Sequence, residues 1–279
     1  MRKLVLLFAL CACVLVGCDR DPINIVEIEE EQQVVVNFSA TESSLKSPGT
    51  PAERLVNDII LFGADATGNL TRYADISGTT TTTLTISKAV KTFYAIANPT
   101  TALRTAAAPV TTLTALQNLT GTYGAATQPG SPFIMSGSVA IDNSTVTINL
   151  IRTVAKVNIN ALNGLVISSV EVQNTPLNVY AFQKSSFAVP AGMTSYTGST
   201  SLYVTENVST SPTRFVVTGT YLSEPANYTI TLKQSDANID IKRNTIYSVD
   251  IEPTTTTSCI VSFTVVDWAD VNTDPHIIP

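Results

Sequence analysis

Short runs in which hydrophobic and polar residues alternate fill most of the chain, and Gly, Pro, Asn or Ser separate them. A period of two predicts β-strands with one buried face, and the even spacing of the runs is typical of antiparallel sandwiches. In the first half, strands are expected within residues 32–40, 54–70, 79–99 and 132–159. In the second half they are expected in "LVISSVEVQN", "LNVYAF", "SLYVTEN", "TRFVVTGTYL", "NYTITLKQ", "IYSVDIEP" and "CIVSFTVVDW".

Residues 100–125 form the one region whose pattern suits a helix. Leu113, Leu116 and Leu119 recur at helical spacing, and Thr111 or Thr112 precedes them as a candidate N-cap. We therefore expect a short helix that packs on a sheet.

A boundary between two domains is expected near Leu150–Thr153, where a long strand pattern runs from Thr145 to Ile159. A break there divides the exported chain into near-equal halves. The predicted fold class is all-β, with two tandem antiparallel β-sandwich domains and a short helix in the first. We assign residues 32–151 to the N-terminal β-sandwich domain and residues 152–279 to the C-terminal one.

The first residues have the organisation of an export signal. Arg2 and Lys3 are basic, and the apolar run from Leu4 to Val16 is shorter than the roughly 20 residues of a membrane-spanning helix. The following "LVGC" resembles the lipobox of bacterial lipoproteins, in which the cysteine is lipidated and becomes the first residue. On this interpretation residues 1–17 are a signal peptide, Cys18 carries lipid, and residues 18–31 are a tether. The alternative is an ordinary signal peptide that happens to contain cysteines.

Composition and charge argue against several classes of function. The net charge of -6 and pI near 4.8 come without a basic stripe, so we expect no nucleic-acid partner. The sole histidine, His276, lies in a polar tail without an orienting partner, so we expect no enzyme. We also expect no metal and no cofactor. Cys259 is the one cysteine beyond position 18, which excludes a disulfide within the exported chain and suggests a small buried hydrophobe.

Seven segments, in this order, resemble the fimbrillins, the subunits of type V pili in Bacteroidales: "NDIILFGADATGNL", "FYAIANP", "FIMSG", "LIRTVAKVNI", "SLYVTEN", "RNTIYSVDI" and "FTVVDW". The resemblance runs from about residue 32 to residue 270. It implies two transthyretin-like sandwich domains, export as an outer-membrane lipoprotein, a place in a surface fimbrium, and a contribution to adhesion. It also implies neighbouring fimbrial subunits as partners and polymerisation by strand exchange.

In that scheme a protease cuts after the first strand, and a C-terminal strand of the next subunit fills the vacated groove. The resemblance implies a displaced strand containing Val34, Val35, Val36 and Phe38. It implies a donor strand containing Val265, Val266, Trp268 and Val271. The candidate cleavage residues are Lys46 and Arg54. Alternatively, the first strand is a permanent edge strand and Trp268 is a core residue of the last strand.

Two features depart from the family pattern. Lys46 stands in the stretch where fimbrillins carry the scissile arginine, and Arg54 is expected at the start of the second strand, where access is poorer. An uncut subunit would serve as a membrane anchor or a filament terminus. The tail "ADVNTDPHIIP" has two prolines that limit extended pairing.

The rival hypothesis is a non-polymerising surface lipoprotein that binds a glycan or a host protein. Exposed aromatic side chains gathered on one face would favour it. The candidates are Tyr180, Phe182, Tyr196, Tyr203 and Tyr221.

Overall fold

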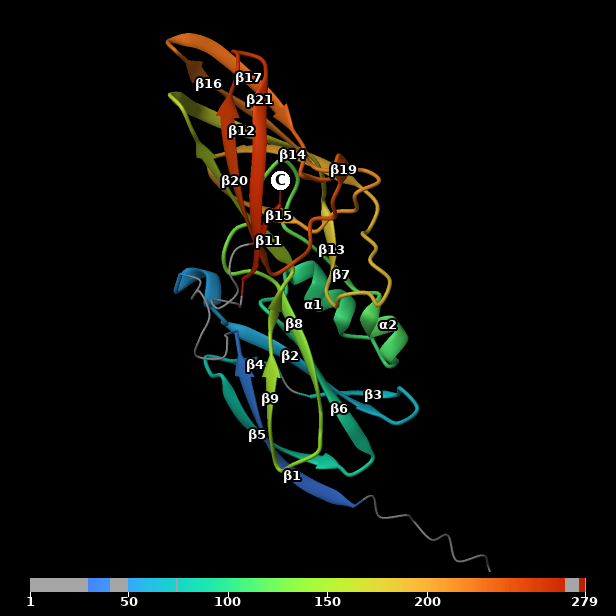
Figure 1. The fold of residues 1–279 in the computed structure, drawn as a ribbon. Helices are drawn as coiled ribbons and strands as arrows, with labels where there is room; N and C mark the ends of the chain where they lie inside the picture. The colour runs from blue at the N-terminus through green and yellow to red at the C-terminus, as the bar shows by residue number, and fades with distance from the viewer. Residues whose placement is uncertain (1–29, 41–49, 74, 269–275, 279) are drawn as a thin grey trace, which may run out of the picture.

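The computed structural model describes residues 30–40, 50–73, 75–268 and 276–278. Over these ranges the chain is all-β, as predicted, with two short helices and one 3-10 turn. Figure 1 shows its two halves stacked end to end, with strands β1, β5 and β9 in one half and β12, β16 and β21 in the other. The helical elements are η1 (Ala52–Arg54), α1 (Thr101–Ala107) and α2 (Leu113–Gln117).

The N-terminal half is a sandwich of two sheets. The smaller sheet has the order β5 (Thr81–Ser87), β1 (Glu31–Ser39), β9 (Thr145–Asn149). The larger has the order β10 (Ile151–Arg152), β8 (Met135–Ala140), β6 (Val90–Ala97), β2 (Asp58–Asp65), β3 (Leu70–Arg72), with β4 (Ile76–Ser77) paired to β2. Inward residues of both sheets form one apolar cluster, which we call the N-terminal core.

The C-terminal half is a second sandwich with its own core. One sheet has the order β15 (Ser201–Thr205), β11 (Val154–Ala161), β20 (Thr245–Pro253), β21 (Cys259–Asp267), β22 (His276–Ile278). The facing sheet has the order β14 (Met193–Gly198), β12 (Leu165–Pro176), β16 (Arg214–Tyr221), β17 (Glu224–Ile230). A small hairpin of β18 (Lys233–Gln234) and β19 (Ala237–Asn238) completes it.

Strand β2 is buried on both faces, which explains why its sequence is a continuous apolar run. Ile59 and Leu61 point into the N-terminal core, whereas Ile60 and Phe62 belong to a separate cluster with the helices. Leu116, one of the leucines expected at helical spacing, is fully buried in that cluster. The predicted helix region therefore does pack on a sheet.

The helices begin at threonines. The Thr112 side chain accepts a hydrogen bond from the Ala115 N–H, so it is the N-cap of α2, one of the two threonines proposed for that role. Thr100 caps α1 in the same way, through the Leu103 N–H.

Strands from both halves also pair directly. Strand β7 (Thr120–Thr122) follows the helices, and β13 (Asn178–Tyr180) comes from the second half of the sequence; they form a two-stranded antiparallel sheet. The predicted boundary between residues 151 and 152 falls inside β10. It remains a prediction about folding units.

Two strand pairs differ from the antiparallel expectation. Strand β1 runs parallel to β9, and β11 runs parallel to β20. Both pairs join strands that lie far apart in the sequence, where the connection is long enough to return the chain in the same direction.

Gly137 of β8 provides a test of the packing between the two sheets of the N-terminal half. A Cβ at this position would lie 2.2 Å from the Asn149 carbonyl oxygen and 2.8 Å from Cγ2 of Ile148. We expect Gly137→Ala to lower the free energy of unfolding by about 1–3 kcal/mol, because the backbone of β9 must move. Urea denaturation measures the change.

The matched control is Gly130→Ala, because a Cβ there would meet no atom within 4 Å. It should change the free energy of unfolding by no more than about 0.5 kcal/mol. Equal effects of the two substitutions would contradict the proposed close approach of β8 and β9.

Candidate assembly site

Strand β1 lies between two strands that do not pair with each other. It pairs antiparallel with β5, where Val36 faces Thr82, and parallel with β9, where Val36 faces Val146. Further backbone hydrogen bonds extend both ladders. On the β9 side the Val35 N–H donates to the Ser144 carbonyl, and on the β5 side the Phe38 N–H donates to the Thr80 carbonyl, each at 2.8 Å. The interpretation of β1 as an edge strand is therefore wrong, because both of its backbone edges are occupied.

The apolar face of β1 is part of the N-terminal core. Val34, Val36 and Phe38 are buried there, together with Val146 and Ile148 of β9. Val35 is half-buried and points to the opposite face. Full burial of side chains of this size stabilises by about 1.5–3 kcal/mol each, so the three contribute much of what holds β1 in place.

The candidate cleavage residues follow β1. Lys46 lies outside the described residues. Arg54 is half-buried in η1, and not at the start of the second strand as expected, since β2 begins at Asp58. Pro51 favours the turn, and the Leu55 N–H closes it by donating to the Ala52 carbonyl at 3.3 Å.

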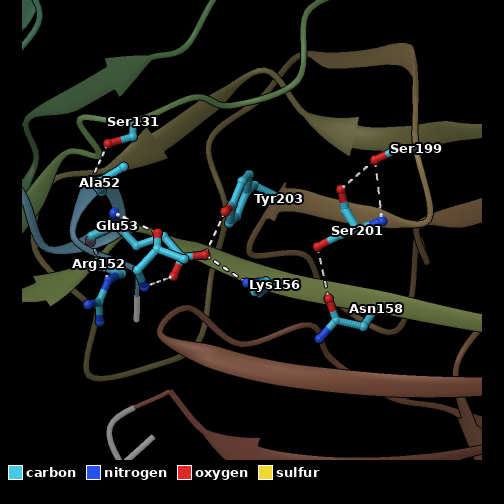
Figure 2. A network of polar contacts seen from close by, with 10 residues as sticks. Ala52, Glu53, Ser131, Arg152, Lys156, Asn158, Ser199, Ser201 and Tyr203 are labelled. Carbon is cyan, nitrogen blue, oxygen red and sulfur yellow. Dashed lines mark hydrogen bonds and ion pairs between the residues drawn. The ribbon is translucent and has the colours of Figure 1, made fainter. Parts of the chain in front are cut away.

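Glu53, next to Arg54, is the centre of a buried polar network (Figure 2). Its side chain is 2% exposed. The carboxylate accepts hydrogen bonds from Lys156 Nζ at 2.8 Å, from the Tyr203 hydroxyl at 2.5 Å and from the Thr50 N–H at 2.6 Å. Lys156 and Tyr203 belong to β11 and β15, so this carboxylate attaches the segment that follows the first strand to the C-terminal half.

The pKa of Glu53 reflects two opposing influences. Burial favours the neutral acid, but the hydrogen bonds from Lys156, Tyr203 and the Thr50 N–H together outweigh it, so the pKa is lowered from its ordinary value. Burial, followed by the Glu53 carboxylate, raises the pKa of Tyr203, which is therefore a donor at all ordinary pH values.

Arg152 forms the second part of this network. It is 1% exposed, and its Nε donates to the Glu53 carbonyl at 2.9 Å, while one terminal nitrogen donates to Asn244 Oδ1 at 3.0 Å. The other terminal nitrogen reaches the Ala40 carbonyl, at the end of β1, at 3.4 Å. The guanidinium also lies over the Trp268 ring, 4.7 Å from its centroid. Arg152 therefore contacts the residue after β1, η1 and the residue after β21 at once.

The sequence interpretation assigned no role to Glu53 or Arg152. Arg152 carries a signal, since it interrupts the apolar run "NLIRTVAKV" where a buried side chain is expected. Glu53 carries none, because it stands in a polar loop sequence.

The predicted donor residues are divided between two environments. Val265 and Val266 are half-buried in β21, opposite Tyr247 and Ile246 of β20. Trp268 is fully buried in the N-terminal core, where its ring stacks on Tyr203 at 5.8 Å with an interplanar angle of 4°. Val271 lies outside the described residues.

The tail pairs despite its prolines. His276–Ile278 forms β22, which lies antiparallel to Phe263–Val265 at the outer edge of β21. The expectation that the prolines limit pairing is wrong for these three residues, because Pro275 and Pro279 lie just outside the strand.

The aromatic residues that would favour a sugar-binding face are not gathered on one. Phe182 packs with the helices, Tyr196 lies in the apolar core of the C-terminal half, and Tyr203 packs against the N-terminal core. An open groove of about 530 Å³ between β17 and β21 includes Tyr228, but this residue is 2% exposed and its hydroxyl donates to the Thr255 carbonyl. It offers no ring face for stacking.

The sequence singles out two cysteines, Cys18 and Cys259. Cys18 lies outside the described residues, and Cys259 is a free, half-buried thiol whose pKa is raised by burial.

Among the described residues no group of three His, Cys, Asp or Glu side chains could hold a metal ion. In the same part of the chain, no helix has the length and apolar character needed to cross a membrane.

Comparison with solved structures identifies the fold. The tip fimbrial protein Mfa3 from Porphyromonas gingivalis, with a C-terminal truncation, matches with a TM-score of 0.62 and 16% identity over 86% of this chain and 100% of its own. A fimbrial assembly protein from Parabacteroides distasonis matches with 0.61 and 13% identity, over 90% and 100%. A protein with a proposed role in cell adhesion from Bacteroides eggerthii matches with 0.61 and 19%, over 86% and 96%.

No protein-family model and no curated protein sequence matches the chain. The fold likeness is nevertheless plain: the chain has the fimbrillin-like fold of Bacteroidales fimbrial proteins, as the seven segments predicted.

Glu53 provides a test of the network. Replacing it by Gln should lower the free energy of unfolding at pH 7 by about 1.5–3 kcal/mol, because Lys156 loses a charge-assisted partner. A carboxyl group with a lowered folded-state pKa contributes stability that is fully present above its unfolded value and lost as pH falls through the folded value. The difference between wild type and Glu53→Gln should therefore shrink below pH 4.5, the ordinary value for this group. Urea denaturation over a pH series measures it.

The control is Glu30→Gln, which removes the exposed ion pair with Lys88. Its denaturation midpoint should not move measurably, because solvent screens that pair. A pH-independent difference for Glu53→Gln would argue against an ionised carboxylate in the network.

Proposed function

We propose that this protein is a structural subunit of a cell-surface fimbria and assembles by donor-strand exchange. The observation that carries the proposal is the position of β1 between β5 and β9. If β1 leaves, two strands keep unpaired backbone edges, and the N-terminal core is left open along one strand's width. An incoming strand would satisfy both needs at once.

Such an exchange has a direction. The accepting groove lies in the N-terminal half, and the donor would come from the C-terminal end of a neighbouring subunit. Because the two surfaces differ, each contact is head-to-tail and the product is an open filament. The fold shared with a tip fimbrial protein and a fimbrial assembly protein supports this assignment.

The remaining parts of the proposal rest on the sequence. Cys18 is the proposed lipidation site, which would bring the subunit to the outer membrane and the cell surface. The partners are other fimbrial subunits and, through adhesion, a surface ligand. No catalytic role is proposed.

A membrane-anchor subunit is the second candidate, and the environment of Arg54 favours it. A cut after Arg54 would separate Glu53 from the body and leave Lys156 and Arg152 without that residue's acceptors. Breaking a buried charged pair in this way is costly. If Lys46 is not used either, β1 and the lipid stay in place.

The first test is the mass and N-terminal residue of the mature protein, taken from the membranes and fimbriae of the cells that produce it. We expect a start at Ser47 in the assembled form, because that cut leaves the Glu53 network intact. Acylated Cys18 at the start of every molecule would instead identify an anchor or a non-polymerising lipoprotein. A start at Leu55 would contradict our argument about Arg54.

A second test uses a peptide of residues 31–40. Added in excess to cut subunits, it should refill the groove and stop filament growth, seen by electron microscopy and light scattering. The control peptide carries Asp in place of Val34, Val36 and Phe38, and should not inhibit because its inward face is charged. Equal growth with both peptides would refute the exchange of β1.

A further inference from the structure

Trp268 is held in the N-terminal core although it comes directly after a strand of the C-terminal half. Its backbone N–H donates to the Asn244 carbonyl at 2.8 Å, and its ring packs against Phe133 and Tyr203. Its indole N–H, by contrast, has no acceptor: among buried side-chain polar atoms of the described residues, this nitrogen alone lacks a hydrogen bond. A buried donor without an acceptor loses its hydrogen bonds to water and gains none in return. Burial of the indole N–H therefore has a desolvation cost that destabilises Trp268 in this site.

Two features connect this site to β1. The first is the N-terminal core itself, which contains Trp268 together with Val34, Val36 and Phe38. The second is Arg152, whose guanidinium covers the indole ring and also reaches the Ala40 carbonyl. Arg152 binds the Asn244 side chain as well, and Asn244 holds the backbone of Trp268. The arginine therefore contacts both Ala40, which directly follows the strand proposed to leave, and the residue proposed to be donated.

We infer that Trp268 is a plug whose seating depends on β1, and that Arg152 transmits the state of β1 to it. With β1 present, the core is closed and Arg152 is fixed between Ala40, Glu53 and Asn244. When β1 leaves, Arg152 loses the Ala40 carbonyl and water enters the core. The indole N–H can then bind water, and Trp268 moves out of its site.

This inference rests on the proposed removal of β1 and adds an order of events to it. A subunit would expose Trp268 at the end of β21 only after its own groove has opened. The donor end would thus be withheld in subunits that still carry their first strand. Premature exposure of a large apolar side chain, with the aggregation that it promotes, would be avoided.

Trp268 is the only tryptophan of the chain, so its fluorescence reports the plug without labelling. The experiment uses the full exported chain with a specific protease site placed between Ala40 and Thr50. After cutting, the fragment containing β1 is separated, and mass spectrometry confirms its removal. Emission wavelength and acrylamide quenching are then compared for the uncut chain, the cut chain that retains β1, and the chain from which β1 has been removed.

We expect the uncut chain and the cut chain that retains β1 to give blue-shifted, weakly quenched emission. Removal of β1 should shift the emission to the red and raise the quenching constant several-fold, and adding the peptide of residues 31–40 should reverse both changes. Unchanged emission after removal of β1 would overturn the inference but leave strand exchange standing. Circular dichroism monitors whether the C-terminal half stays folded. If β1 cannot be removed without unfolding that half, both proposals fail.

Arg152→Met tests the route. Methionine keeps an unbranched side chain but has neither the charge nor the N–H donors, so the difference in quenching between chains with and without β1 should become smaller. The control, Arg104→Met, removes an arginine of α1 that pairs with Asp58 and Asp75, and should keep the full difference. A full difference in Arg152→Met would refute the role of this arginine. If that variant does not fold, Asn244→Ala replaces it under the same criterion, because it removes the side-chain oxygen that accepts from Arg152 and keeps the backbone carbonyl that accepts from Trp268.

Discussion

The N-terminal half depends on β1 to bridge β5 and β9. Each of those strands has an apolar face in the core, but neither pairs with the other, so the three-stranded sheet exists only while β1 lies between them. Backbone groups at an open edge need a partner, and the apolar residues beneath need cover. One strand supplies both, which makes this position both a structural requirement and a natural point of exchange.

The junction of the two halves shows a different kind of constraint. Glu53 and Arg152 are charged groups held almost out of water, where each would be costly alone, and Lys156, which pairs with Glu53, is half-buried. Hydrogen bonds compensate for this cost. The Glu53 carboxylate accepts three of them, and the Arg152 guanidinium donates to the Glu53 and Ala40 carbonyls and to the Asn244 side chain. Such groups tolerate few alternative arrangements, so we expect them to fix how η1, β11 and the end of β21 meet.

Sequence reasoning succeeded where local patterns decide structure. The pattern of "QQVVVNFSA" correctly predicted a strand, because the side-chain period of two is a property of the strand backbone alone. The structure adds that Val34, Val36 and Phe38 form its inner face and that Val35 does not. The cap of α2 was narrowed to Thr111 or Thr112 because a capping hydrogen bond spans only three residues, and the structure selects Thr112. Arg54 was misplaced because a three-residue turn has no periodicity to detect.

What the sequence by itself determined was therefore the all-β class, the inward face of the strands and, through the order of its segments, the fimbrillin-like fold. Only the tertiary structure decided which strands are neighbours, that β1 is central, and that Trp268 lies in the core of the other half. The Arg152–Glu53 bond joins positions separated by 99 residues. Contacts of that range depend on how complete sheets pack, and a strand's own sequence specifies its faces but not its neighbours.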